Sequence, residues 1–342
     1  MTLMKQETME CPLVADQFLK NVYPLAHAEG QLICAGSYDH LQVLGRGSSS
    51  HAGTILRYGA SGLSNLLVSA AMPSISSTQG AGTSNAKRSV VIAISQSGKS
   101  PDLIQYVSQA RIRGSRVCSL VNTPSSALAR NSDLEIELHA GPENAVAATK
   151  STFAAGLACL GLLSGIEHQI KGENALFKDF SAIPEMTQKS LSLDWSALTA
   201  LLPKSRAVFF IGRGATLGIA KELALKVTET TGIPAIAYSS AEFLHGPIGA
   251  VDATTPVIAM SSDKSYHSSI QTCLSQTRDR KAPTLLSQTF GASDLDTVHC
   301  YEAFTDALLM LPPAYLAIEA AATHMGRNPD TPVGLNKVTE TI

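Results

Sequence analysis

Short apolar runs alternate with amphipathic stretches along most of the chain. The first half has the pattern of buried strands at 41–44, 89–95, 116–121 and 134–138, and the pattern of helices at 53–66, 101–113 and 145–164. Apolar runs of about four to eight residues are typical of strands that are covered on both faces. Strands that alternate with helices of this length predict a parallel sheet with helices on both sides.

The pattern is present twice. Gly45 and Gly212 each follow the first strand of a copy, and they lie 167 positions apart. Ser95 and Ser261 end the next strand of each copy, 166 positions apart. Two nearly equal offsets predict an internal duplication. We therefore expect an α/β protein built from two tandem doubly wound parallel-sheet domains of the flavodoxin-like type, with helices on both faces.

The apolar and polar stretches also suggest where the domains end. We expect an N-terminal helical lead-in at 1–35, a first domain at 36–175, a linker helix and second domain at 176–325, and a C-terminal tail at 326–342. The tail contains Pro329 and Pro332, and two prolines so close cannot sit inside a helix. We expect the tail to be an extended segment laid over the surface.

Composition narrows the class of protein. The 342 residues are enough for two hydrophobic cores, and 44% are hydrophobic while only 16% are charged. The net charge of −2 provides no basic face for nucleic acid. The most apolar stretch, 153–163, is too short for a membrane span, and the first residues lack the apolar core of a signal peptide. With six scattered cysteines and no Cys-x-x-Cys pair, we expect a reduced, soluble cytoplasmic protein.

The segment 95–100, Ser-Gln-Ser-Gly-Lys-Ser, lies where a buried strand ends and a helix begins. Ligands of open α/β sheets bind beyond the carboxyl ends of strands, and the free N–H groups of a helix start suit a phosphate. The alternative is a serine-rich turn in which Ser100 merely caps the helix. The serines at 48–50 follow the neighbouring strand and favour the phosphate site. The equivalent turn of the second copy carries Asp263, which would repel a phosphate, so we expect one site per chain.

Other ligand motifs are incomplete. Gly45-Arg46-Gly47 begins a dinucleotide fingerprint, but Ser50 stands where the third glycine is needed. There is no P-loop, and the nine histidines show no spacing typical of metal ligands. We expect neither a metal nor a cofactor.

Lys226 and Glu229 stand three residues apart on a predicted helix and so share one face. The alternative is a solvated ion pair at the surface. His245 directly precedes Gly246-Pro247, a rigid setting that fits general acid–base chemistry. The alternative for His245 is a loop histidine bonded to the backbone.

Taken together, these segments resemble tandem SIS (sugar isomerase) domains, in particular the isomerase half of glucosamine-6-phosphate synthase. The resemblance covers nearly the whole chain. The motifs that carry it are Ser95-Gln96-Ser97-Gly98, Ala147-Ala148-Thr149-Lys150, Ala224-Leu225-Lys226 with Glu229, Glu242-Phe243-Leu244-His245-Gly246-Pro247, and Leu335-Asn336-Lys337.

The resemblance implies a role for each matching residue. It implies that the sugar phosphate is held by Ser49, Ser95, Gln96, Ser97 and Ser100, and that the sugar is contacted by Val146 and Ala147.

The resemblance also implies the catalytic groups. Glu229 would move the proton between C1 and C2 of the open-chain sugar, and Lys226 would stabilise the enediol oxygen. Lys337 would sit at the sugar carbonyl, as a Schiff-base former or a positive partner for the oxyanion. His245 would help to open the ring and would reach in from a second subunit, which implies a homodimer. Lys99, Ala148 and Val333-Gly334 depart from the family pattern.

Two features favour a deaminase over a synthase. The isomerase-like part starts almost at Met1, with no amide-cleaving domain before it, and the tail from Asn328 to Thr341 is similar to that of stand-alone glucosamine-6-phosphate deaminases. We therefore expect glucosamine 6-phosphate to give fructose 6-phosphate and ammonia. The alternatives are an isomerase or deglycase of another phosphosugar, such as galactosamine 6-phosphate or fructosamine 6-phosphate, and a non-catalytic sugar-phosphate sensor.

Overall fold

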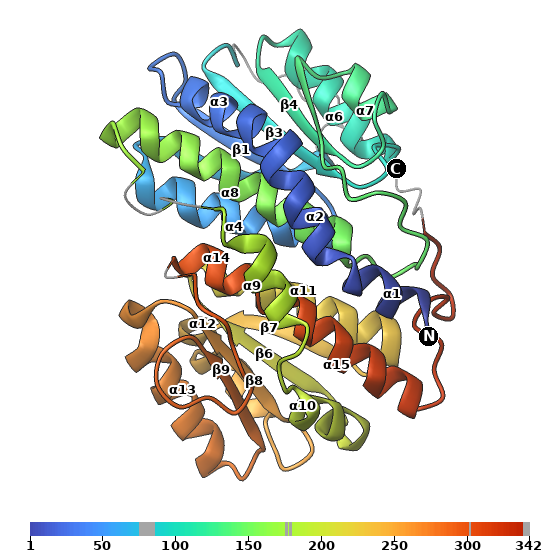
Figure 1. Ribbon diagram of the computed structural model, residues 1–342. Coiled ribbons are helices and arrows are strands. Elements are labelled where there is room, and N and C mark those ends of the chain that lie inside the picture. Colours follow the sequence, from blue (N-terminus) through green and yellow to red (C-terminus); the bar gives the residue numbers. More distant parts are fainter. Residues whose placement is uncertain (75–85, 175–176, 178–179, 301, 338–342) are drawn as a thin grey trace. The chain divides into compact units, whose positions relative to one another are not determined.

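The computed structural model describes residues 1–74, 86–174, 177, 180–300 and 302–337 (Figure 1). They divide into two compact units, each built around one parallel sheet. The five-stranded unit comprises Val14–Pro142 and Ser151–Ser181, and the four-stranded unit comprises Met1–Leu13, Glu143–Lys150 and Ala182–Lys337. The predicted domain boundaries at 35, 175 and 325 remain a prediction.

The sheet of the five-stranded unit has the strand order β2-β1-β3-β4-β5, with every neighbouring pair parallel. Its strands are β1 (His40–Leu44), β2 (Leu67–Ala70), β3 (Ser89–Ser95), β4 (Arg116–Val121) and β5 (Leu134–Glu137). Its helices are η1 (Phe18–Val22), α3 (Tyr23–Ile33), α4 (Gly47–Leu63), α6 (Pro101–Ile112), α7 (Ala127–Arg130) and nearly all of α8 (Lys150–Lys171), while α2 (Cys11–Gln17) spans the division between the units.

Alternate residues of these strands face opposite sides of the sheet. Val43 and Ile94 point toward α4, where Gly53 allows the helix to approach them. Val91 packs on the other side in one core with Leu103 of α6. This period of two is what a strand covered on both faces requires, and it confirms the predicted fold class.

The four-stranded unit repeats the arrangement, with the parallel order β7-β6-β8-β9. Its strands are β6 (Val208–Gly212), β7 (Ala235–Ser239), β8 (Val257–Ser261) and β9 (Thr284–Gln288). Its helices are α1 (Leu3–Met9), α9 (Ile183–Ser190), α10 (Ser196–Leu201), η2 (Leu202–Lys204), α11 (Ala215–Thr231), α12 (Ser240–Leu244), η3 (Pro247–Ala250), η4 (Lys264–Tyr266), α13 (His267–Asp279), α14 (Ala303–Leu308) and α15 (Leu311–His324). Because β7-β6-β8-β9 matches β2-β1-β3-β4, the predicted duplication is confirmed.

Several element boundaries differ from the prediction. The expected helix at 53–66 begins already at Gly47, since a positive φ of 49° at this glycine turns the chain directly from strand to helix. The expected helix at 145–164 begins only at Lys150, because Glu143 Oε1 accepts the N–H of Thr149 and holds the preceding residues out of the helix. The unpredicted strands β2, β7 and β9 lie at sheet edges, where partial exposure replaces a continuous apolar run.

Helix α8 is long and apolar enough to cross a membrane, but 83% of its most apolar 18-residue window is buried inside the protein. It packs against α3 through glycine. A Cβ atom on Gly165 would lie 1.9 Å from the carbonyl oxygen of His27, and one on Gly30 would lie 2.1 Å from that of Leu162. The two helix backbones therefore touch, which only glycine permits.

We expect Gly165→Ala to destabilise the protein by about 1–3 kcal/mol, because the added methyl group must push α3 away from α8. Gly62→Ala is the matched control, since a Cβ there meets nothing within 4 Å, and alanine should stabilise α4 by about 0.5–1 kcal/mol. Urea unfolding of both variants measures the difference. Equal stabilities would contradict the close contact of α3 with α8.

Candidate active site

The predicted phosphate turn after β3 is held in shape by its own serines. Ser95 Oγ accepts a hydrogen bond from Gly98 N–H at 3.1 Å, and Ser97 Oγ accepts one from Lys99 N–H at 3.3 Å. Ser100 occupies the N-cap position of α6, but its side chain makes no capping hydrogen bond. Ser100 therefore stands at the cap position without capping α6 through its side chain, and the phosphate site remains a prediction.

Gly98 is required at this turn for two reasons. Its φ is +60°, and a Cβ there would lie 2.0 Å from Ser126 Oγ. The backbone of the turn is also bonded to the segment beyond β4, since Asn122 N–H donates to Gln96 O at 3.1 Å and Leu128 N–H donates to Gly98 O at 3.0 Å. These hydrogen bonds fix the shape of the turn.

The serines at 48–50 lie in the first turn of α4 rather than in a loop after β1. Arg46, just before α4, binds Asp102 in the first turn of α6, with Nε and Nη2 at 2.9 and 2.8 Å from Oδ2. This ion pair joins the starts of the two helices. Ser49 and the Ser95–Ser100 turn therefore lie at neighbouring helix N-termini, where β1 and β3 form the topological switch point of the sheet.

The corresponding turn of the four-stranded unit is occupied by its own carboxylate. Asp263 Oδ1 accepts hydrogen bonds from Ser265 N–H at 2.8 Å and from Ser265 Oγ at 2.7 Å. An anion bound there would displace these bonds and meet the charge of Asp263. The expectation of one phosphate site per chain remains a prediction.

Helix α11 carries a buried ion-pair cluster. The Lys226 side chain is 1% exposed, and its Nζ donates to Glu229 Oε2 at 2.5 Å and lies 3.6 Å from Glu222 Oε1. Glu222 accepts a hydrogen bond from Tyr315 Oη of α15 at 3.2 Å. Glu229 is 22% exposed. The interpretation of Lys226 and Glu229 as a solvated surface pair is therefore wrong.

The electrostatics of the cluster keep Lys226 charged. Burial lowers the pKa of Lys226, but the carboxylates of Glu222, Glu229 and Glu143 raise it by more, so that it lies above its ordinary value. The pKa of Tyr315 is raised well above its usual range, first by burial and then by Glu222. Lys226 therefore carries its positive charge at neutral pH.

Lys337 of the tail reaches the segment that precedes α8. Its Nζ donates to Ala145 O at 2.6 Å and to Glu143 Oε2 at 3.2 Å. Glu143 is buried and also accepts Thr149 N–H at 2.9 Å. Val146 N–H donates to Asp330 O at 3.0 Å. Lys337 and Val146 are therefore brought together on the segment Glu143–Lys150, where Ala147 is buried.

The same segment is bound from the N-terminus. Glu7 of α1 accepts the N–H groups of Asn144 and Ala145, and Lys150 forms an ion pair with Glu10. Burial raises the pKa of Glu7, while the hydrogen bond from Asn144 N–H opposes that rise. Residues from both ends of the chain thus fix the position of Glu143–Lys150.

His245 ends α12, where its backbone N–H donates to Glu242 O at 3.1 Å. Its side chain is exposed, and its imidazole makes no hydrogen bond to any residue that the structure describes. The alternative of a loop histidine with its side chain bonded to the backbone is not what this geometry shows. Among the described residues, no hydrogen bond or ion pair connects His245 to the cluster around Lys226.

The structure adds residues that the sequence did not single out. Glu222 is four residues before Lys226 on the same helix, a spacing that could have revealed it. Tyr315, Glu143 and Glu7 lie far from Lys226 in sequence, and no local pattern marks them. Among the predicted site residues, Gln96 and the serines belong to the five-stranded unit. The four-stranded unit holds the rest, which are Lys226, Glu229, His245, Lys337, Val146 and Ala147.

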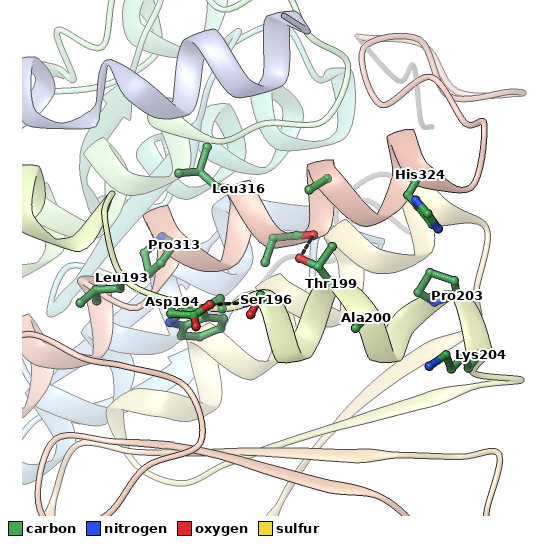
Figure 2. A pocket seen from close by; sticks show the side chains of 13 residues that line it. Leu193, Asp194, Ser196, Thr199, Ala200, Pro203, Lys204, Pro313, Leu316 and His324 are labelled. Atoms are coloured by element: carbon green, nitrogen blue, oxygen red, sulfur yellow. Dashed lines mark hydrogen bonds between the residues drawn. The ribbon is translucent and has the colours of Figure 1, made fainter.

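A separate groove of about 670 Å³ lies between α10 and α15 in the four-stranded unit (Figure 2). Apolar side chains such as Pro313 and Leu316 line it. Thr199 Oγ1 donates to Ala317 O at 3.1 Å in its wall. None of the predicted site residues lines this groove, so it is distinct from the candidate active site.

Comparison with known proteins places these features in a family. The model of the SIS domain family matches residues 37–164 and 201–289. Glutamine–fructose-6-phosphate aminotransferase (isomerizing) of Thermotoga maritima is 34% identical over 262 residues, which are 72% of this chain and 43% of that protein. The chain spans about half the length of the curated relatives it matches.

Solved structures are similar over almost the whole chain. A Silicibacter pomeroyi protein provisionally assigned as a phosphosugar isomerase has a TM-score of 0.87 and 31% identity, covering 96% of this chain and all of that one. Glucosamine-6-phosphate deaminase of Thermotoga maritima has a TM-score of 0.80, covering 99% of this chain and 100% of that one. At 18% identity, the second likeness concerns the fold alone.

We expect Lys226→Met to destabilise the protein by about 3–5 kcal/mol, because it removes the ammonium that lies 3.6 Å from the buried Glu222 carboxylate and that bonds Glu229. The double variant with Glu222→Gln should recover part of the loss. Since the pKa of Lys226 is raised above its ordinary value of 10.5, the contribution of its charge is complete below that pH and is lost only as the pH rises through the higher native value. Urea unfolding at pH 7 and pH 9 should give the same difference between wild type and Lys226→Met. If the difference in unfolding free energy is smaller at pH 9 than at pH 7, the pKa of Lys226 is not raised.

Proposed function

The chain belongs to the SIS domain family, and we propose that it is a phosphosugar isomerase that deaminates glucosamine 6-phosphate to fructose 6-phosphate and ammonia. The observation that carries the proposal is the pairing of Glu229, partly exposed, with the buried Lys226. A carboxylate that reaches solvent while its neighbouring ammonium stays charged can exchange a proton with a carbon acid.

The proposed reaction is a proton transfer between adjacent carbons. In the open-chain substrate, Glu229 removes the proton from C2, and the electrons of the C–H bond pass to the C1 carbonyl oxygen as an enolate forms. Lys226 stabilises the negative charge on that oxygen. The C1 oxygen takes up a proton while the C2 amine loses one, and Glu229 returns the proton it removed to C1, which leaves a hydroxyl group on C1 and an imine at C2. Water then adds to the imine carbon and ammonia leaves, which yields fructose 6-phosphate.

Two further residues complete the proposal. Lys337 acts at the sugar carbonyl, either as a positive partner for the oxyanion or as a Schiff-base former. His245 assists ring opening, and we propose that it does so from a second subunit of a homodimer. Its exposed side chain supports a role that needs a partner outside its own unit. We also propose that the protein acts in the cytoplasm.

The turn of the five-stranded unit supplies the phosphate site in this proposal. Ser49, Ser95, Gln96, Ser97 and Ser100 offer hydroxyl, amide and backbone donors at the starts of α4 and α6. The N–H groups at a helix start can bind an anion even where no cationic side chain is present. A phosphate site of this kind is compatible with the net charge of −2.

The choice of an amino sugar depends on the tail. Residues 328–337 follow the pattern of the SIS-type deaminases, and 338–341, which continue it, lie outside the described residues. Isomerases or deglycases of galactosamine 6-phosphate or fructosamine 6-phosphate are the rival assignments. A sugar-phosphate sensor is the remaining one, and the presence of Glu229, His245 and Lys337 weighs against it.

We expect Glu229→Gln to lower kcat for ammonia release from glucosamine 6-phosphate by about 10²–10⁴-fold, because it removes the proton carrier. Glu185→Gln, at an exposed ion pair of α9, is the control and should retain the wild-type rate. Rates on galactosamine 6-phosphate and fructosamine 6-phosphate identify the preferred sugar. The assignment fails if the wild-type protein releases no ammonia or if Glu229→Gln does so unchanged, and binding without turnover would indicate a sensor.

We expect Ser97→Ala to raise KM about tenfold with little change in kcat, since it removes a hydrogen bond to a charged phosphate. Ser37→Ala, at an exposed serine of the same unit, serves as the control. Steady-state kinetics and competition by inorganic phosphate measure both effects. An unchanged KM together with unchanged inhibition by phosphate would place the phosphate elsewhere.

A further inference from the structure

The turn that connects α15 to the tail has a shape of its own. Asn328 Oδ1 accepts a hydrogen bond from Asp330 N–H at 3.0 Å, and Asn328 Nδ2 donates to Thr331 Oγ1 at 2.9 Å. Such an asparagine turn orders the backbone without help from neighbouring elements. It presents Asp330 in a defined orientation.

Asp330 binds two other segments of the four-stranded unit. Its carboxylate accepts the N–H groups of Leu3 and Met4 at the start of α1, each at 2.8 Å. Its carbonyl oxygen accepts Val146 N–H at 3.0 Å. A carboxylate at a helix N-terminus makes charge-assisted hydrogen bonds and also interacts favourably with the helix dipole. Asp330 is therefore a strong anchor for the tail.

The segment that Asp330 holds is the one that receives Lys337. Lys337 Nζ donates to Ala145 O, one residue before the Val146 N–H that bonds to Asp330. The residues between the two anchors are mostly exposed, with Val333 at 93%. Within that stretch, Leu335 N–H donates a backbone hydrogen bond to Pro332 O at 3.2 Å. The position of Lys337 thus depends on its own hydrogen bonds and on those of Asp330, since the exposed residues between them make few contacts.

We infer that Asp330 is a positioning residue for Lys337. Asp330 fixes the tail to α1 and to Val146, and this shortens the flexible stretch of chain before Lys337. The Lys337 amine therefore has fewer accessible positions. The entropy cost of placing the amine at the site is met on folding and not at each turnover. The inference rests on the proposed function, because the action of Lys337 on the substrate is part of that proposal. It assigns no contact with substrate to Asp330.

The test compares Asp330→Ala and Asp330→Asn with Val333→Ala, a control in the same exposed stretch. Asp330→Ala should lower kcat for glucosamine 6-phosphate about tenfold while KM changes by less than about twofold, because the phosphate site is untouched. Asp330→Asn keeps one acceptor oxygen and should fall between wild type and Asp330→Ala. Val333→Ala should match wild type.

A second readout needs no substrate. In the wild-type protein two acceptor oxygens hold the Lys337 amine. In Asp330→Ala, acetic anhydride should acetylate this amine about threefold faster. Mass spectrometry measures the rate relative to that of the exposed Lys189 in the same sample. This rise distinguishes a failure of positioning from a failure of the proposed function, since it is expected even if the sugar is wrong. Wild-type labelling and wild-type kcat in folded Asp330→Ala would overturn the inference. If that variant does not fold, the same results in Asp330→Asn overturn it.

Discussion

A lysine ammonium that is taken out of water loses most of its hydration, and the free-energy cost is several kcal/mol unless opposite charges surround it. Lys226 meets this condition with Glu229 at 2.5 Å and Glu222 at 3.6 Å. Tyr315 Oη donates to the same oxygen, Glu222 Oε1, and this hydrogen bond offsets part of the cost of burying the carboxylate. The packing of α11 against α15 brings these groups together, so the arrangement of this unit and the charge of Lys226 depend on each other.

The segment Glu143–Lys150 shows a second constraint. It belongs to the four-stranded unit although the residues before and after it belong to the other unit. Its backbone donors must find partners away from regular structure, and they find Glu7, Glu143 and Asp330. Glu7 and Asp330 come from the two ends of the sequence, whereas Glu143 belongs to the segment itself. The position of Glu143–Lys150 therefore depends on all three of these partners.

The two sheets share the strand order of four strands, but their switch-point turns carry different side chains. Both units have a switch point between their first and third strands, where a loop meets a helix start. In one unit this turn is built from serines around Gly98, whereas in the other Asp263 binds its own neighbouring serine. Identical topology therefore offers the same binding position twice, and local side chains decide whether an anion can use it.

The sequence by itself determined the parallel α/β architecture, the duplication, the glycine-bounded serine turn and the helix that bears Lys226 and Glu229. These features are local, because apolar period, glycine conformation and helical spacing act over a few residues. Only the tertiary structure decided that Lys226 is buried, that Glu222, Glu143 and Tyr315 complete its surroundings, and that Asp330 anchors the tail. Apart from the four-residue spacing of Glu222 and Lys226, these depend on contacts between residues far apart in the sequence, such as Tyr315 with Glu222 at 93 positions and Asp330 with Leu3 at 327. Burial sets the energy of a charge, and it is a property of the packed chain and not of any segment within it.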